Sequence, residues 1–188
     1  TGEWWNIIVP DLELHIDVKN QAEIRKGSLT CSRCSRRYLI RKGIPDFLLE
    51  SGDIITREQK GWERLKQAVE NTDELMLSLP DAPGEHQACW KGQAENFHHI
   101  FSQLGLTGNE RILDMGAGRC WSTRFFSRKG CWSAAVDILL PRYIGLETAD
   151  IYIERENTYF ERLRSSMDSL PFRDSVFDIV FMAAALHH

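Results

Sequence analysis

The chain has 188 residues, of which 43% are hydrophobic and 27% charged, and its formal net charge is −4. This length and composition predict a globular protein with one main domain and a small additional module, and the acidic balance argues against a surface that binds nucleic acid throughout. No apolar run approaches about 18 residues, so neither a membrane span nor a signal peptide is predicted. Five irregularly spaced cysteines favour a reducing cytoplasm over a secreted disulfide framework.

A small β-rich module is predicted for residues 1–50. Apolar runs and apolar–polar alternation indicate short strands, and Gly43-Ile44-Pro45 is typical of a turn. The predicted strands cover residues 7–9, 12–18, 28–30 and 38–40.

Two helices are predicted after this module. The first covers residues 56–71, with Thr56 as its N-cap, and the second covers residues 85–104 and is ended by Gly105. Their apolar faces include Trp62, Leu65 and Val69 in the first helix and Trp90, Phe97, Ile100, Phe101 and Leu104 in the second. Residues 51–85 are therefore predicted to be a helical connector.

From Arg111 onward, predicted strands alternate with predicted helices, which is the pattern of a parallel sheet covered on both faces. Residues 112–115 form the first buried strand, residues 120–129 the following helix, and residues 133–137 the second strand. Residues 86–188 are therefore predicted to form an α/β core of the doubly wound, Rossmann-like type.

Gly116 and Gly118 lie at the turn between the first core strand and its helix. They remove side chains where the backbone bends and where a ligand must come close. A phosphate-binding loop would need Gly-Lys-Ser/Thr here, but residues 119–121 are Arg-Cys-Trp. A dinucleotide-binding turn would need glycine in place of Trp121, which weakens that alternative without removing it. A third class of turn carries an acid two residues before the first glycine, and Asp114 fits it.

Three segments in order resemble class I S-adenosylmethionine (SAM)-dependent methyltransferases. The run ILDMGAG is similar to the first motif of the family, with Cys120 at the place of its third glycine. Asp137 ends a second strand about 20 residues beyond the glycines. Residues 167–188 resemble the adenine-binding turn and the fourth strand of the family. The resemblance covers roughly residues 86–188 and implies SAM as the cofactor.

The resemblance implies a role for each matching residue. Asp114 would attract the ammonium of the methionine moiety, and Asp137 would accept hydrogen bonds from the ribose hydroxyls. Asp168 and the backbone N–H that follows it would bind the adenine, which Leu139 and Leu170 would sandwich. The predicted cofactor-binding residues are Asp114, Gly116, Ala117, Gly118, Asp137, Ile138, Met167, Asp168 and Ser169.

His187 and His188 are the candidates for catalysis. Methyl transfer from a sulfonium needs mainly alignment and exclusion of water, and a general base matters only when the acceptor must lose a proton. The two histidines follow the fourth predicted strand, where the family places residues that face the acceptor. The alternatives are that they only wall the pocket or that the pair is the remnant of a purification tag.

A stretch that contains Cys31 and Cys34 resembles the second half of the short zinc-ribbon proteins that activate tRNA and protein methyltransferases. Val9 and Leu12 stand where those proteins have their first cysteine pair. Structural zinc needs four ligands, and His15 offers only a third. We therefore predict a ribbon-like module without metal, with zinc binding and a reactive cysteine pair as the alternatives.

Seven basic residues and no acid lie between Arg25 and Lys42. This segment favours a contact with RNA phosphates or with an acidic protein, and the alternative is a solvated hairpin edge whose charges block strand pairing. The basic residues are Arg25, Lys26, Arg33, Arg36, Arg37, Arg41 and Lys42.

Together these features predict a cytoplasmic SAM-dependent methyltransferase with a ribbon-like N-terminal module. Because the core of the family has seven strands and this sequence reaches only the fourth, we expect the C-terminal half of the core to be missing from it. A small-molecule acceptor is slightly favoured over RNA or protein. The alternatives are a non-catalytic SAM-fold subunit that binds a partner through the N-terminal module, and an NAD-dependent oxidoreductase.

Overall fold

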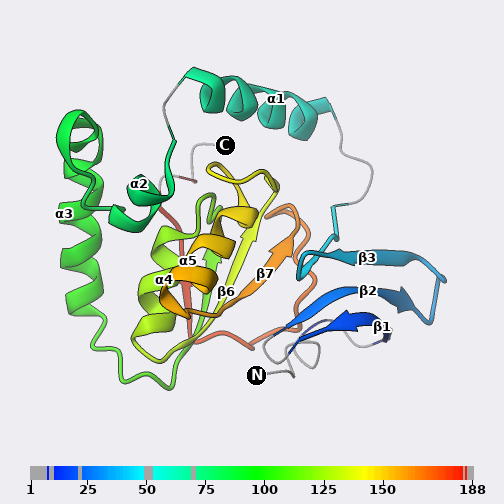
Figure 1. The fold of residues 1–188 in the computed structure, drawn as a ribbon. Coiled ribbons are helices and arrows are strands. Elements are labelled where there is room, and N and C mark those ends of the chain that lie inside the picture. The colour runs from blue at the N-terminus through cyan, green and yellow to red at the C-terminus, as the bar shows by residue number, and fades with distance from the viewer. Residues whose placement is uncertain are drawn as a thin grey trace.

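The computed structural model describes residues 8, 11–20, 23–48, 53–68, 71–183 and 185. Within these residues, two four-stranded sheets lie side by side, and helices cover one face and one end of the second sheet (Figure 1). The first, called here the N-terminal sheet, contains β1 to β4. The second, called the parallel sheet, contains β5 to β8.

The carboxyl ends of all four strands of the parallel sheet lie at the same edge. Its strands are β5 (Arg111–Met115), β6 (Trp132–Asp137), β7 (Glu161–Arg164) and β8 (Ile179–Phe181). Their order is β7-β6-β5-β8, and every neighbouring pair is parallel. The chain therefore leaves β5 on one side and returns as β8 on the other, which creates the switch point where open α/β sheets bind ligands. The predicted α/β class with a parallel sheet is confirmed.

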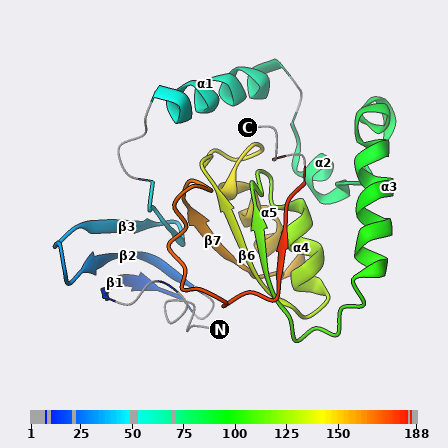
Figure 2. The same cartoon turned by 180° about the vertical axis from the view of Figure 1, so that it is seen from behind.

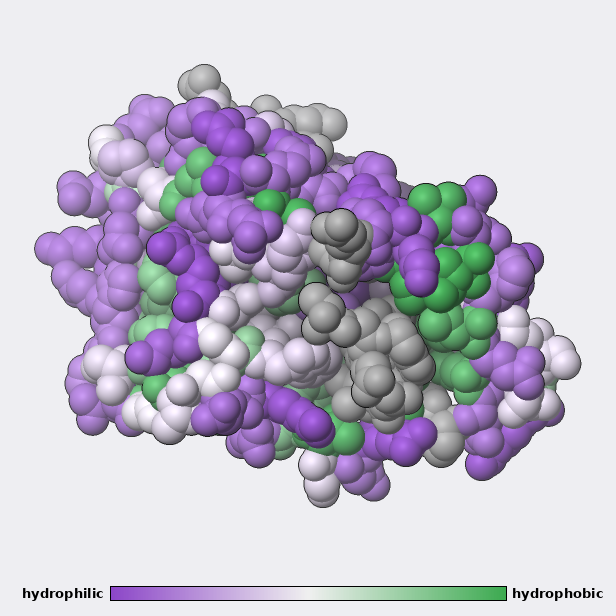
Figure 3. Space-filling model, turned by 60° about the horizontal axis from the view of Figure 1, so that its bottom comes forward, coloured by the Kyte–Doolittle hydropathy of each residue, from purple (hydrophilic) through white to green (hydrophobic). Residues whose placement is uncertain are grey.

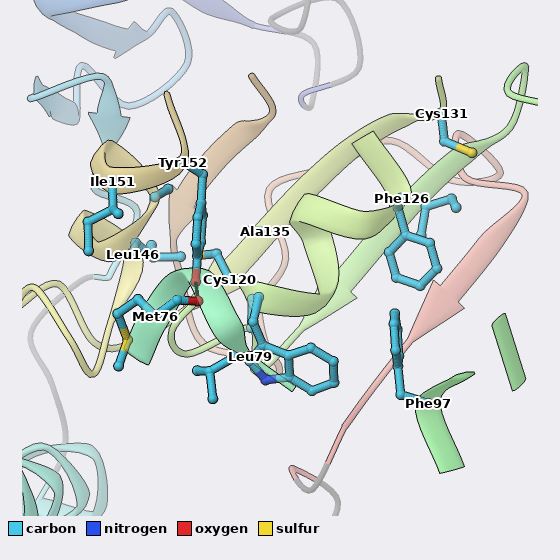
Figure 4. Packing of buried hydrophobic residues seen from close by; sticks show 14 of the residues in the cluster. Met76, Leu79, Phe97, Cys120, Phe126, Cys131, Ala135, Leu146, Ile151 and Tyr152 are labelled. Carbon is cyan, nitrogen blue, oxygen red and sulfur yellow. Dashed lines mark hydrogen bonds between the residues drawn. The ribbon is translucent and has the colours of Figure 1, made fainter. Parts of the chain in front are cut away.

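Helices cover one face of the parallel sheet. They are α3 (Gln87–Gln103), α4 (Trp121–Arg128) and α5 (Ala149–Glu156), with 3-10 turns at Gly84–His86 and Leu146–Thr148. Phe97 of α3 packs edge-to-face against Trp121 and Phe126 of α4, with ring centroids 4.8 and 6.0 Å apart (Figure 4). Ile112 and Ala135 from the sheet belong to the same buried cluster.

The opposite face of the parallel sheet shares a buried cluster with the N-terminal sheet. Because side chains alternate between the faces of a strand, Leu113, Ala134 and Val136 point away from the helices. They form a buried cluster with residues of the N-terminal sheet, among them Leu29 and Ile40. The two sheets thus share a hydrophobic core across the predicted boundary near residue 50, and that boundary stays a prediction.

The N-terminal sheet is an antiparallel β module, as the sequence predicts. Its strands are β1 (Leu12–Lys19), β2 (Ile24–Cys31), β3 (Arg37–Arg41) and β4 (Ile44–Pro45). The turn ends two residues earlier than the predicted range of residues 43–45. It lies at Lys42 and Gly43, which have positive φ angles of 51° and 77°. Ile44 and Pro45 therefore pair with β3.

The margins of the N-terminal sheet are partly apolar. Figure 3 shows apolar surface gathered on the side of the molecule where β1 to β3 lie, and Ile16 and Val18 of β1 are 41% and 52% exposed. Ile8 is the only described residue of the predicted strand at residues 7–9, and it forms an isolated bridge with Phe172.

Two helices, α1 (Asp53–Ala68) and α2 (Asp73–Ser78), precede α3. Because α1 begins three residues before Thr56, that residue is not its N-cap as predicted. The sequence analysis missed α2, whose N-cap is Thr72; its side chain accepts a hydrogen bond from the Leu75 N–H at 3.1 Å. Helix α1 lies across the end of the parallel sheet where the strands finish (Figures 1 and 2). No described helix is long and apolar enough to span a membrane.

Arg162 of β7 links the N-terminal sheet to the core through a buried ionic network. Its side chain is fully buried. Nη2 donates to Glu23 Oε2 at 2.9 Å and to the Lys42 carbonyl at 3.0 Å, and Nη1 donates to Asp150 Oδ1 at 2.8 Å. Burial alone would lower the pKa of Arg162, but the charges of Glu23 and Asp150 raise it overall, so the guanidinium stays charged.

Replacing Arg162 with methionine should destabilise the protein by about 3 kcal/mol, because Glu23 and Asp150, which are 14% and 17% exposed, lose a fully buried partner and keep only Arg25 nearby. The control is Lys42→Ala, which removes a pair with Glu147 at the surface and should cost less than about 1 kcal/mol. Urea unfolding followed by circular dichroism gives both values. Equal losses in the two variants would contradict the assignment of Arg162 as the link.

Candidate functional site

A cavity of about 770 Å³ lies at the carboxyl edge of the parallel sheet. The turn after β5 and the segments after β6, β7 and β8 form its floor, and α1, α2 and α3 supply residues to its opposite wall. This is the place at which α/β sheets bind ligands, and the volume lies in the range of small-molecule sites.

The turn after β5 has the backbone that its glycines predict. Gly116 and Gly118 have φ angles of 66° and 49°, and both line the cavity with Ala117 between them. A Cβ at Gly116 would lie 2.5 Å from the Cβ of Ala185, whereas a Cβ at Gly118 would meet only a carbonyl oxygen at 3.6 Å. Cys120 has a φ of 58°, which explains why this position favours glycine in the motif that the sequence resembles.

Asp114 is buried beneath the turn and does not line the cavity. Its Oδ2 accepts hydrogen bonds from Ser122 and Thr123, each at 2.6 Å, and its Oδ1 has no hydrogen-bond partner among the described residues. Burial raises the pKa of Asp114 to about 6; the two hydroxyls lower it and the charge of Asp137 raises it further. The Asp114 carboxyl thus contacts the start of α4, directly after the glycine turn, and not the cavity.

Asp137 lines the cavity and organises the turn at the same time. Its Oδ2 accepts from the Gly118 N–H at 2.8 Å, and its Oδ1 accepts from the Leu139 N–H at 2.7 Å. Each carboxylate oxygen can accept more than one hydrogen bond, so these contacts do not exhaust its capacity. The Asp137 side chain therefore connects the glycine turn after β5 to the end of β6.

The structure brings most of the other predicted cofactor residues to the same cavity. Ile138 lines it after β6, and Met167 and Asp168 line it after β7. Ser169 is not among the lining residues, and its N–H donates to the Ser166 carbonyl at 3.3 Å.

The two leucines predicted to sandwich the adenine lie apart. Leu139 lines the cavity, whereas Leu170 packs against the cluster between the two sheets. His187 and His188 lie outside the described residues.

Sequence reasoning missed the wall that α1, α2 and α3 contribute. Trp62 and Trp90 were predicted to pack on apolar helix faces, yet both line the cavity, and Trp62 is 38% exposed. Gln59 of α1 donates to the Ile138 carbonyl at 3.0 Å and so links α1 to the segment after β6. Other lining residues that the analysis did not single out are Ile55, Glu58, Leu75, His86, Cys89, Gln93, Arg119, Ile144, Ser165, Ser166, Ala183 and Ala185. The presence of a tryptophan in each of the two predicted helices was the feature of the sequence that could have indicated this wall.

The predicted metal and partner residues lie far along the N-terminal sheet. Leu12 is opposite Cys31 in the β1–β2 pairing, His15 Nε2 lies 3.2 Å from Asp17, and Val9 is outside the described residues. In the described part of the chain, no three His, Cys, Asp or Glu side chains group closely enough to hold a metal ion. The exposed residues of the basic segment are Lys26, Arg33, Arg36, Arg37, Arg41 and Lys42.

The raised pKa of Asp114 makes stability depend on pH. An unfolded aspartate has a pKa of about 3.9, so the folded state favours the protonated carboxyl and loses stability as pH rises from about 4 to about 6. Relative to Asp114→Asn, the wild-type free energy of unfolding should therefore fall by about 1 kcal/mol between pH 5 and pH 7.5.

Urea unfolding at the two pH values measures this difference. The control is Asp174→Asn, which changes an exposed carboxylate. Other titrating groups, such as Glu161, are common to the wild type and the variants and cancel. A wild-type to Asp114→Asn difference that is the same at both pH values would show that Asp114 ionises normally.

Comparison with known proteins agrees with this geometry. Residues 113–188 match a family model described as a methyltransferase domain. A demethylmenaquinone methyltransferase of Tropheryma whipplei (strain Twist) is 32% identical over 130 residues, which are 69% of this chain and 47% of that protein. The chain thus spans about half the length of this curated relative.

Solved structures of lower similarity cover part of the chain. The YcgJ protein of Bacillus subtilis is 25% identical over 50% of this chain and 40% of that chain, with a TM-score of 0.45. A SAM-dependent methyltransferase from Aquifex aeolicus is 18% identical over 64% of this chain and 55% of that chain, with a TM-score of 0.41. The family model that matches residues 113–188 and the curated relative are both methyltransferases, which agrees with the enzyme class predicted from the sequence.

Proposed function

We propose that this chain binds SAM in the cavity beside Gly116 and transfers its methyl group to a small-molecule acceptor. The observation that carries the proposal is the position of Asp137, which lines the cavity while holding the glycine turn through the Gly118 N–H. An acid that could accept hydrogen bonds from ribose hydroxyls thus lies beside the glycine turn at one switch point, which supports the proposal.

The residues present fit the cofactor. Gly118 leaves open space beside the turn, where a Cβ would meet only the Ile144 carbonyl oxygen at 3.6 Å. Among the described residues, Asp114 Oδ1 is buried and has no hydrogen-bond partner. Asp137 would hold the ribose hydroxyls with its remaining acceptor capacity, and Asp168 and Met167 would lie along the adenine. The ammonium would face Asp114, whose ionised form it would favour.

The contribution of the protein to the reaction would be mainly alignment. Bound SAM supplies a methyl group that its sulfonium already activates, so the chain has to position the acceptor in line and exclude water. The α1–α3 wall would do both, because its residues line the same cavity as the glycine turn and α1 lies across the end of the sheet.

A small, largely apolar acceptor fits this wall better than a polymer does. Ile55, Trp62, Leu75 and Trp90 supply apolar and aromatic surface. Arg119 is also at the cavity, but its guanidinium lies over the Trp90 ring, 5.8 Å from the centroid. The relative from Tropheryma whipplei is named for a small-molecule acceptor, demethylmenaquinone. His86, on the same wall, joins His187 and His188 as a candidate to take up a proton.

The alternative is a non-catalytic subunit that binds SAM and holds RNA or a protein through the basic segment. Its support is the exposure of the basic side chains on β2 and β3. SAM binding without methyl transfer to small molecules, RNA or protein would favour this alternative.

Asp137→Asn should weaken binding of S-adenosylhomocysteine by roughly 10- to 100-fold, because hydrogen bonds to a charged acceptor contribute about 1.5–3 kcal/mol. Isothermal titration calorimetry at pH 7.5 measures the dissociation constant for the wild type, for this variant and for Asp174→Asn. The exposed Asp174 control should bind as the wild type does.

The same titrations with NAD test the oxidoreductase alternative. Tighter binding of NAD than of S-adenosylhomocysteine, or equal affinity of the wild type and Asp137→Asn for S-adenosylhomocysteine, would contradict the proposal. Thermal unfolding of each variant verifies that it is folded at the temperature of the titration.

Trp62→Ala should raise the KM for the acceptor by about tenfold or more while changing the affinity for S-adenosylhomocysteine less than threefold, because Trp62 lies on the wall opposite the cofactor turn. Transfer of labelled methyl from SAM to a panel of phenols, quinols and amines identifies the acceptor. Trp62→Phe keeps an aromatic face and is the matched control. A parallel loss of cofactor binding in Trp62→Ala would contradict this division of the cavity.

A further inference from the structure

Cys31 and Cys34 lie on a turn that hydrogen bonds hold in place. The turn leads from β2 to β3. The Cys31 N–H donates to the Arg36 carbonyl and the Ser35 N–H donates to the Cys31 carbonyl, both at 2.8 Å. The Ser32 N–H donates to the Asp11 carbonyl at 2.7 Å. Both thiols are free, Cys34 is exposed and Cys31 is half-buried, so the fold presents the two sulfurs together at the surface.

The environment of Cys31 favours its thiolate. The backbone N–H groups of Cys34 and Arg33, followed by the Cys34 thiol, lower the pKa of Cys31, while burial and the Asp11 carboxylate oppose this. Asp11 is itself paired with the Arg33 guanidinium at 2.7 Å, and Arg36 and Arg37 are exposed beside the turn. Hydrogen-bond donors of this kind stabilise a thiolate and make a cysteine a better nucleophile near neutral pH.

The described residues offer these two thiols no metal site. Leu12, which cannot bind a metal, lies opposite Cys31 in the β1–β2 pairing. Across the described ranges, no third His, Cys, Asp or Glu completes a cluster with the pair. A dithiol without a metal and on an exposed turn has thiol–disulfide exchange as its available chemistry.

We propose that Cys31 and Cys34 form a thiol–disulfide exchange site that reacts with low-molecular-weight disulfides. The Cys31 thiolate attacks one sulfur of oxidised glutathione, forms a mixed disulfide and releases one glutathione thiolate. Cys34 then gives its proton to solvent and attacks the Cys31 sulfur, which forms the Cys31–Cys34 bond and releases the second glutathione. The two cysteines are oxidised by two electrons, and one molecule of oxidised glutathione is reduced to two thiols.

The remaining cysteines provide internal controls. Cys120 is buried, and burial raises the pKa of its thiol. The pKa of Cys131 is raised to about 11 by burial and by its hydrogen bond to Glu110. Cys89 is exposed on α3, and it is the matched control for a single accessible thiol.

The experiment exposes the reduced full chain to oxidised glutathione at pH 7, stops the reaction with acid, and follows intact mass and peptide maps. The wild type should lose two hydrogen atoms and form a Cys31–Cys34 disulfide. Cys34→Ser should instead accumulate one glutathione adduct on Cys31, which should form at least about tenfold faster than the adduct on Cys89. In Cys31→Ser, the glutathione adduct on Cys34 should form more slowly than the adduct on Cys31 forms in Cys34→Ser.

Three results would overturn the proposal. The first is a wild type that keeps separate glutathione adducts on the two cysteines, and the second is a Cys31 that reacts no faster than Cys89. The third is a purified chain that carries one zinc ion and whose thiols react only after chelation. Serine is close in size to cysteine, and circular dichroism of each variant verifies the fold before reaction.

Discussion

The fold depends on burying the inner strands β5 and β6 of the parallel sheet from both faces. Helices cover one face, and Leu113 and Val136 on the other face belong to a buried cluster that also includes Leu29 and Ile40 of the N-terminal sheet. Since strand side chains alternate between faces, neither cover can replace the other. Arg162 adds a charged link at the β7 edge, where Glu23 and Asp150 leave it no contact with solvent. The N-terminal strands are therefore part of what holds the cavity floor in place.

The two acids of the site show how burial separates residues of the same type. Asp114 lies under the turn, and its desolvation raises its pKa to about 6. Asp137 lies at the cavity and accepts two backbone N–H groups. The first carboxyl would respond to a cation brought by a ligand, and the second is already placed for hydroxyl donors.

Much of the core could be predicted because its signals are local. Buried strands with alternating helices predict β5, α4 and β6, and the glycines predict the positive φ angles at Gly116 and Gly118. The start of α1, the existence of α2 and the pairing of β4 were not predicted. These features depend on contacts with distant residues, such as those of Gln59 with Ile138 and of Arg142 with Asp73. Short elements have too little periodicity to be identified alone.

The sequence by itself determined the parallel sheet, the glycine turn and the acids that follow β5 and β6, because each is specified by residues within a few positions of one another. Only the tertiary structure decided that Trp62 and Trp90 line the cavity, that Asp114 is buried and does not line it, and that residues of the N-terminal sheet share a buried cluster with the core. These depend on which segments, far apart in the sequence, bury one another. Hydrophobic burial is non-directional, so an apolar helix face does not specify in advance what it will contact.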